Sequence, residues 1–190
     1  MKRLEEVKIA LINTVLIILA IILIGRLLDT ISSGIIKFLA KNFGTAFALL
    51  FANRLTFIGT VYHELSHTIV LIITGAKITK LELFKPKGDR LGQVKYINRG
   101  NFIFKSIQNT LSAIAPVFFG CAAIYLIYNQ IINCNSIYLI ILLVYMLVSI
   151  LLHTTMSNQD LKMAIKGLPI CFLLLFIVMY ITKLNIIELI

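Results

Sequence analysis

Long runs of apolar residues, separated by short polar stretches, dominate the pattern of this 190-residue chain. A helix needs about 20 mostly apolar residues to cross the hydrocarbon core of a bilayer, and uncharged runs of that length are typical of spanning helices. We therefore expect an all-α polytopic membrane protein, with residues 1–190 forming a single integral membrane domain. The predicted spans cover about 8–28, 46–74, 107–132, 137–157 and 167–182, which makes five transmembrane helices.

Two shorter segments show different patterns. Residues 31–43 carry apolar residues at helical spacing with lysines on one side, and we expect this segment to lie along the membrane surface. Residues 77–98 alternate polar and apolar positions on either side of the turn sequence KPKGDR, which is typical of a β-hairpin. The predicted fold is thus a helical membrane domain with one short β-hairpin.

The composition supports a membrane protein. Hydrophobic residues make up 59% of the chain and charged residues 14%, whereas ordinary soluble domains hold about 45–50% apolar and about 25% charged residues. These values argue against a soluble globular domain and exclude a disordered chain. The net charge of +10 comes from 18 basic and 8 acidic residues. In a membrane protein such an excess is typical of cytoplasmic loops, so we expect the lipid bilayer, and not nucleic acid, as the partner.

The basic residues also predict an orientation. They gather at the N-terminal flank, in and after the hairpin segment, and in the loop before the last predicted span. In a five-span arrangement these three stretches lie on one side of the membrane, and the positive-inside rule assigns that side to the cytoplasm. We therefore expect the N-terminus and the β-hairpin to be cytoplasmic and the C-terminus to lie outside.

The second predicted span contains His63-Glu64-Leu65-Ser66-His67, which is the pattern H-E-x-x-H. Residues four apart share one face of a helix, so both imidazoles can reach the same metal ion. Neutral imidazole is a good ligand of Zn²⁺, and a glutamate beside the first histidine can activate the zinc-bound water by taking its proton. Ionisable residues inside a span are costly and mark functional sites, which favours a zinc site with Glu64 as its base over a pair of buried structural histidines.

Further polar residues of this span lie on the same helical face. Asn53, Thr56 and Thr60 precede His63 and His67 at steps of three or four residues. Such a stripe should face the bundle interior or a water cavity, because polar groups are not tolerated against lipid. Each of the first three residues alone can also be explained as a hydrogen bond between helices.

A catalytic zinc ion usually has three protein ligands, so a third must come from elsewhere in the chain. Asp160 lies at the end of an apolar span, in the same membrane leaflet as His67, and shares one face with His153 and Ser157 if the helix continues. We therefore favour Asp160 as the third ligand. His153, Ser157 and Asn158 are candidates for contacting the ligands or for replacing Asp160, with His153 as the first alternative.

These motifs, taken in order, resemble the site-2 protease family of intramembrane zinc metalloproteases in its small bacterial form. The resemblance covers about 46–165. It rests on the H-E-x-x-H pattern within a span, a strand region after that helix, a proline near the start of a later span, and a late aspartate. In this chain they are His63–His67, Lys77–Phe84, Ala115-Pro116 and Asp160 after Ser157-Asn158-Gln159.

The resemblance implies that His63, His67 and Asp160 hold Zn²⁺ and that Glu64 is the general base. It also implies cleavage of a peptide bond in or near a transmembrane segment of a membrane protein or peptide precursor, in a bacterial plasma membrane. An extended substrate can add to the edge of the hairpin as a further strand, although the hairpin can equally be a basic loop that faces lipid headgroups. The candidate substrate-binding residues on this edge are Lys80, Leu81, Glu82 and Leu83.

Two other functions are compatible with the same residues. The first is a catalytically inactive membrane scaffold or chaperone that retains a zinc site. The second is a metal-ion carrier. Glu64 argues against a scaffold, because a structural site needs ligands but no base, and the chain lacks the internal repeats that transporters tend to show.

Overall fold

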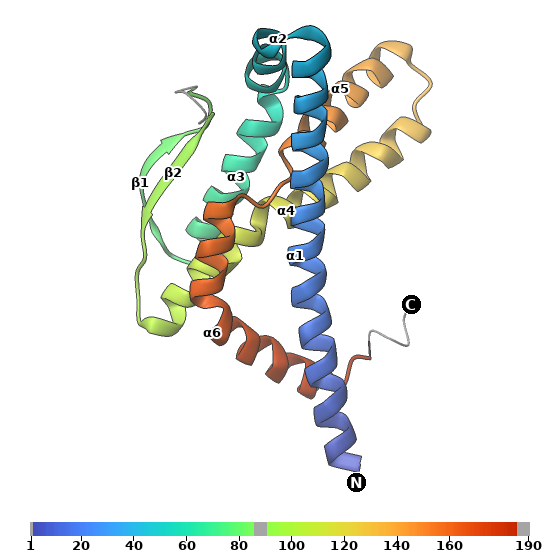
Figure 1. Cartoon of the computed structure of the whole chain (residues 1–190). Coiled ribbons are helices and arrows are strands. Elements are labelled where there is room, and N and C mark those ends of the chain that lie inside the picture. The colour runs from blue at the N-terminus through green and yellow to red at the C-terminus, as the bar shows by residue number, and fades with distance from the viewer. Residues whose placement is uncertain (1, 86–90, 186–190) are drawn as a thin grey trace.

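The computed structural model describes residues 2–85 and 91–185, and this part of the chain is mostly helical with one small sheet (Figure 1). Its elements in chain order are α1 (Lys2–Phe43), α2 (Thr45–Leu50), the π-helical turn η1 (Phe51–Leu55), α3 (Phe57–Ile73), β1 (Lys77–Glu82), β2 (Gln93–Ile97), α4 (Phe102–Ile132), α5 (Ile137–His153) and α6 (Asn158–Thr182). The prediction of a mainly helical chain with one hairpin is confirmed.

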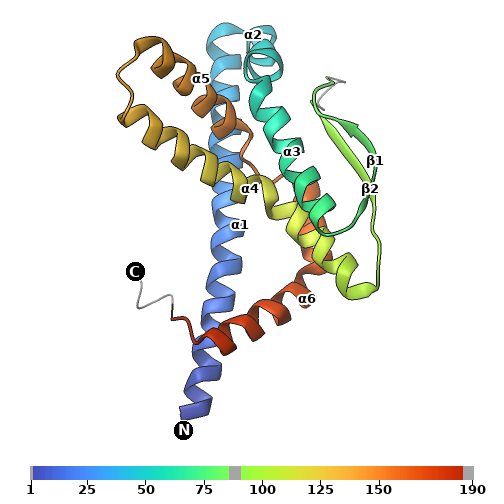
Figure 2. The ribbon, with the colours of Figure 1, turned by 180° about the vertical axis from the view of Figure 1, so that it is seen from behind.

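The first predicted span and the predicted surface segment 31–43 belong to the same helix, α1. At 1.5 Å per residue its 42 residues extend over about 63 Å, roughly twice the thickness of a bilayer core. Only part of α1 therefore fits within the hydrocarbon. Figures 1 and 2 show α1 standing as a column beside the other helices.

The second predicted span is broken. Thr45–Leu55 and Phe57–Ile73 meet at an angle of 52°. The break falls at Thr56, whose backbone leaves the helical region and whose N–H donates to the Phe51 carbonyl, five residues back. The hydroxyl of Thr56 also bonds the carbonyls of Phe51 and Ala52, at 3.1 and 3.0 Å. A π-helical turn of this kind is a recognised cause of a sharp kink.

The prediction of five spanning helices is not confirmed. Among the described residues α1, α4 and α6 are long and apolar enough to cross a membrane, and the bent pair can form a fourth span. α5 is apolar but only 17 residues long. The predicted span of 137–157 is too long, because the helix ends at His153 and residues 154–157, which are mostly polar, are not helical.

The predicted hairpin is present as an antiparallel pair of strands. Lys77 pairs with Ile97 and Glu82 with Gln93, and the register shifts between Ile78 and Lys80. Residues 86–90 of the predicted turn lie outside the described residues. Gly75, with φ of +81°, ends α3 and turns the chain into β1, because glycine adopts this left-handed conformation at little cost.

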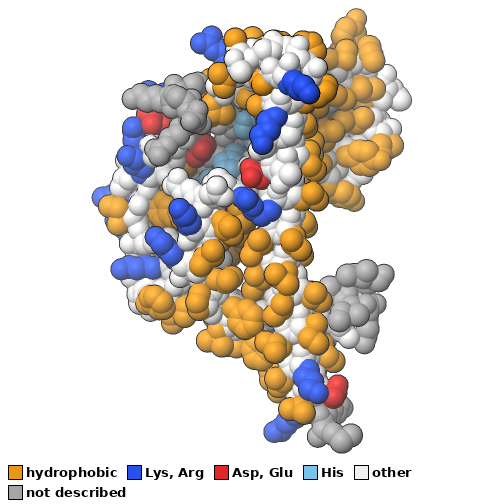
Figure 3. All heavy atoms as spheres, in the orientation of Figure 1, with side chains coloured by type: hydrophobic (Ala, Val, Ile, Leu, Met, Phe, Trp, Pro, Cys, Tyr) orange, Lys and Arg blue, Asp and Glu red, His pale blue; other side chains and the backbone are white. Residues whose placement is uncertain are grey.

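The helices pack through small and polar residues, and the large apolar side chains point outwards (Figure 3). Gly167 of α6 lies directly against the Ser106 carbonyl and the Thr110 side chain of α4. The Thr110 hydroxyl donates to the Ala164 carbonyl at 3.1 Å. Close approach at small residues, with side-chain hydrogen bonds between helices, is typical of helix packing in membranes.

The contact at Gly167 predicts the effect of a single methyl group. Gly167→Ala would place its Cβ against the Ser106 carbonyl and the Thr110 hydroxyl, and such overpacking costs about 1–3 kcal/mol. We expect a lower unfolding temperature in detergent, followed by circular dichroism. Gly34→Ala in α1 is the control, since its Cβ meets nothing within 4 Å and loss of a helix glycine stabilises by up to about 1 kcal/mol. A Gly167→Ala protein as stable as the Gly34→Ala control would contradict this packing.

Candidate metal centre

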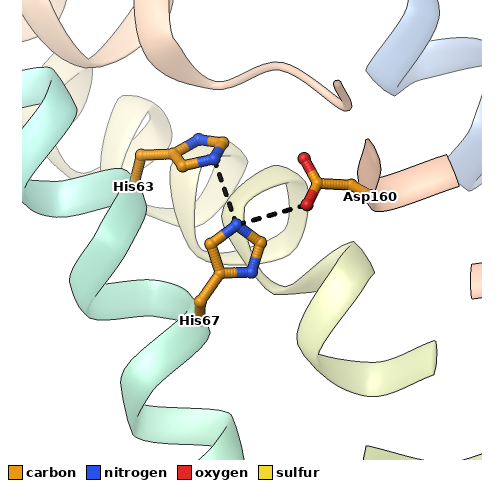
Figure 4. A group of neighbouring side chains, drawn as sticks. All are labelled: His63, His67 and Asp160. Carbon is orange, nitrogen blue, oxygen red and sulfur yellow. Dashed lines mark hydrogen bonds and ion pairs between the residues drawn. The ribbon is translucent and has the colours of Figure 1, made fainter. Parts of the chain in front are cut away.

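Three potential metal ligands from distant parts of the chain meet in the interior. His63 and His67 lie one turn apart on α3, and Asp160 lies in the first turn of α6 (Figure 4). Their ligand atoms all lie within 4.8 Å of one another. His67 Nε2 is 3.1 Å from His63 Nε2 and 3.5 Å from Asp160 Oδ1. The three residues that the sequence favoured as metal ligands are thus brought together.

Backbone carbonyls determine the orientation of both imidazoles. His63 Nδ1 lies 2.8 Å from the carbonyl oxygen of His153, and His67 Nδ1 lies 2.7 Å from that of Ser112. A carbonyl oxygen can only accept a hydrogen bond, so both Nδ1 atoms carry the proton. In the neutral rings, Nε2 is then unprotonated and presents its lone pair.

This arrangement fits a bound cation. Without one, two nitrogen lone pairs and a carboxylate oxygen would face each other at 3.1 and 3.5 Å with no proton between the nitrogens. Ligand atoms about 2.0–2.2 Å from a tetrahedral metal ion such as zinc lie about 3.3–3.6 Å apart. The two separations from His67 Nε2 are close to this range, and the remaining pair lies within 4.8 Å. The donor set of two imidazoles and one carboxylate therefore suits a divalent metal ion.

Asp160 is positioned by the start of its own helix. Ser157 caps α6, because its hydroxyl accepts the Asp160 N–H at 3.1 Å and the Asp160 Oδ2 accepts the Ser157 N–H at 3.0 Å. This reciprocal pair is a capping box. It occupies Oδ2 and leaves Oδ1 directed at His67, while the positive end of the helix dipole favours the carboxylate.

The expectation that one helix carries His153, Ser157 and Asp160 on a shared face is wrong. α5 ends at His153, residues 154–157 form a non-helical connection, and α6 begins at Asn158. The reason is visible in the sequence S-N-Q-D, since Ser followed by Asp at the third position is a signal for a new helix. Asp160 reaches the site from the beginning of α6, and not from the end of α5.

His153 and Asn158 lie near the ligands in different roles. The backbone of His153 holds His63, whereas its ring lies 3.0 Å from the Ser149 carbonyl and against Gly59. The ring does not belong to the group of three ligands. The side-chain oxygen of Asn158 accepts a hydrogen bond from Arg26 at 3.0 Å, which joins the start of α6 to α1.

Glu64 and the three ligands line the same cavity, with a volume of about 360 Å³. Figure 3 shows a hollow in which the histidines are visible, with basic side chains around its opening. Gly92 lies against Glu64, since a Cβ at this position would stand 2.6 Å from Glu64 Cγ. The hairpin therefore covers Glu64 closely, and a larger residue at this position would require the Glu64 side chain to shift.

The hairpin contributes residues that the sequence did not single out. Val94 and Tyr96 of β2 line the cavity, as do Leu91 and Gly92 before the strand. The signal was present, because alternate residues of a strand share one face. The predicted substrate-binding residues do not line this cavity and lie on or just after β1; they are Lys80, Leu81, Glu82 and Leu83.

Glu82, the acidic residue of β1, forms ion pairs with two lysines. Lys80 and Lys85 each place their ammonium nitrogen 3.0 Å from a carboxylate oxygen of Glu82. Both hydrogen bonds hold the pKa of the Glu82 carboxyl below its ordinary value. Glu82 thus belongs to a surface ion-pair cluster.

The residues of the predicted polar stripe have different environments before and after the kink at Thr56. The hydroxyl of Thr56 is used within the π-helical turn. Thr60 is buried and lines the cavity, and its hydroxyl has no hydrogen-bond partner within residues 2–85 and 91–185. Asn53 lies before the break, in η1.

Comparisons with protein-family models, with curated proteins and with solved structures found no match. The interpretation of the site therefore depends on its own geometry and on the sequence motifs.

The metal content of the purified protein tests the ligand set. We expect about one divalent metal ion per wild-type chain, and loss of the ion in His67→Ala and Asp160→Ala, because each removes one of three ligands. His153→Ala is the matched control: it keeps the backbone carbonyl that holds His63, so it should keep the metal. Elemental analysis after detergent purification measures all four proteins. Metal retained in Asp160→Ala but lost in His153→Ala would reverse the assignment.

Proposed function

We propose that this protein is an intramembrane zinc metalloprotease that hydrolyses a peptide bond in or near a transmembrane segment of a membrane-protein or peptide-precursor substrate. The observation that carries this proposal is the position of Glu64. It lies in the same cavity as the three candidate ligands, on the same helix as two of them. A structural metal site requires no such carboxylate beside it.

The donor set favours zinc with an open coordination position. Two histidines and one carboxylate are a recurrent ligand set of catalytic zinc, which leaves one position for water or substrate. When bound, zinc would polarise the scissile carbonyl and lower the pKa of a water molecule. His63, His67 and Asp160 would hold the ion.

The other steps belong to residues of the chain. Glu64 would hold the attacking water, accept its proton on the carboxylate, and deliver that proton to the nitrogen of the leaving amine. Its contact with Gly92 limits the positions that the carboxylate can take. The cavity lies between α3, α6 and the hairpin, so a substrate segment enters beside β2.

A substrate helix must unwind before its backbone can reach the cavity. β1 and β2 form a two-stranded sheet, so each strand has an edge at which an extended segment can add by main-chain hydrogen bonds. We propose that the unwound substrate lies beside the hairpin in this way. The candidate residues on and just after β1 remain Lys80, Leu81, Glu82 and Leu83.

The proposed family and location follow from the same features. The H-E-x-x-H helix, the strands after it and the late aspartate support a relationship to site-2 proteases. Long apolar helices support an integral membrane protein, and we propose the bacterial plasma membrane, with the N-terminus and hairpin on the cytoplasmic side. The second candidate function is an inactive membrane scaffold that retains zinc, which the same metal ligands would also allow.

Replacement of Glu64, the proposed base, distinguishes a protease from an inactive scaffold. Glu64→Gln preserves the size of the side chain and leaves all three ligands, so we expect wild-type metal content and a loss of cleavage of at least about 100-fold. The assay uses liposomes that contain the protein and a pool of synthetic single-span peptides, with products identified by mass spectrometry. A variant that cleaves like the wild type would remove Glu64 from the mechanism. A metal-loaded wild type that cleaves no peptide in the pool would favour the scaffold.

The hairpin contact gives a second prediction for catalysis. Gly92→Ala would force the Glu64 side chain to move, because the new Cβ would lie 2.6 Å from Glu64 Cγ and 3.0 Å from its Oε1. We expect slower peptide cleavage, by about tenfold or more, with unchanged metal content. Gly34→Ala is again the control. Equal cleavage rates in the Gly92→Ala protein and the control would show that the hairpin does not position Glu64.

A further inference from the structure

His67 is held by a carbonyl group inside another helix. Its Nδ1 lies 2.7 Å from the backbone oxygen of Ser112 in α4. In an α-helix that oxygen would accept the N–H of the residue four positions later, which in α4 is residue 116. Residue 116 is a proline, and proline has no N–H. α4 therefore leaves the Ser112 carbonyl open to accept from His67.

Burial makes this hydrogen bond necessary for both partners. Ser112 is 1% exposed and His67 is 7% exposed, and Pro116 is also fully buried. A buried carbonyl without a partner is costly, and α4 itself supplies no N–H to this one. The protonated Nδ1 of His67 supplies the donor.

We propose that Pro116 is a positioning residue of the metal centre: by withholding an N–H from the Ser112 carbonyl, it keeps that oxygen for His67 and directs His67 Nε2 towards Asp160 and His63. The inference rests on the metal site of the proposed function but does not require protease activity. Hydrogen bonds to the outer nitrogen of a ligating histidine fix its tautomer and raise its basicity, and their loss typically weakens metal binding 10–100-fold.

The carbonyl, and not the hydroxyl, of Ser112 is the relevant partner. The Ser112 Oγ lies 3.4 Å from His67 Nδ1, against 2.7 Å for the backbone oxygen. Ser112→Ala removes the hydroxyl and keeps the carbonyl. We expect this variant to bind metal as the wild type does.

The test compares variants of the full-length protein in detergent by competition for Zn²⁺ with a chromophoric chelator. Pro116→Ala restores an N–H that competes for the Ser112 carbonyl, and we expect zinc affinity to fall about tenfold. Pro169→Ala is the matched control, because it makes the same change at an exposed position of α6, and it should keep wild-type affinity.

A backbone ester distinguishes the effect of losing the proline ring from the effect of gaining an N–H. In the ester analogue of Pro116→Ala, lactic acid replaces alanine, so the side chain is the same but the N–H is absent. We expect this analogue to recover the affinity of the wild type. An analogue that binds zinc as weakly as Pro116→Ala would attribute the effect to the proline ring and overturn the proposal.

The tautomer of His67 provides a readout without metal. The chain has three histidines, so ¹⁵N-histidine NMR of the metal-free protein can assign each ring. We expect His67 protonated at Nδ1 in the wild type and a mixture of tautomers in Pro116→Ala. An unchanged tautomer together with unchanged zinc affinity would overturn the proposal. A wild type that binds no metal would instead refute the proposed function, while the tautomer would still decide whether Pro116 controls His67.

Discussion

Two backbone carbonyls, one in the middle of α4 and one at the end of α5, orient the two histidines of the candidate metal centre. Pro116 removes the partner of the Ser112 oxygen inside α4. The His153 oxygen lies at the end of α5, where it also accepts the Thr155 N–H at 2.9 Å. In a membrane such groups find little water and need a partner within the protein. The Nδ1 atoms of His67 and His63 donate to these two oxygens, and this orientation turns the two Nε2 lone pairs towards one another. A cation bound between the two Nε2 atoms would remove the repulsion between their lone pairs.

Interrupted helices surround the site, and the side chain of Ser149 hydrogen-bonds to backbone groups on both sides of one break. The Ser149 hydroxyl accepts the Gly59 N–H at 2.8 Å and donates to the Thr56 carbonyl at 2.9 Å, so it joins both sides of the kink before α3. On the other side of the cavity, the connection between α5 and α6 packs against α1, with Met156 fully buried. Irregular backbone at membrane depth is tolerated where it is buried in protein or lines a cavity. The connection between α5 and α6 meets both conditions, since Met156 is buried and Thr155 and Ser157 line the cavity. At the kink, Thr56 is buried.

The sequence predicted the parts of the site that depend on local spacing. His63 and His67 share a face because they are four residues apart on one helix, and the hairpin alternates as strands must. Asp160 was the favoured third ligand, but it lies at the start of α6 and not on a continuation of α5. The predicted span of 137–157 included Ser157, although the S-x-x-D pattern that starts there is the capping signal that marks the beginning of α6. No proline near Thr56 indicated the break in the sequence. Nothing in β1 or β2 alone indicated which strand faces the cavity, since that depends on how the hairpin packs against α3.

The three ligands depend on the fold to different degrees. Asp160 is oriented within four residues, by the cap that starts its own helix, so its direction is set as soon as α6 forms. Both histidines instead depend on carbonyls of α4 and α5, which are 45 and 90 residues away in the chain. The metal site is therefore complete only when α3, α4, α5 and α6 have packed together. Because a metal ion would bind the assembled site and not the separated helices, its binding free energy would add to the stability of that packing. An ion at this position would join the beginning of α6 to the middle of α3, at the cavity that the three candidate ligands line.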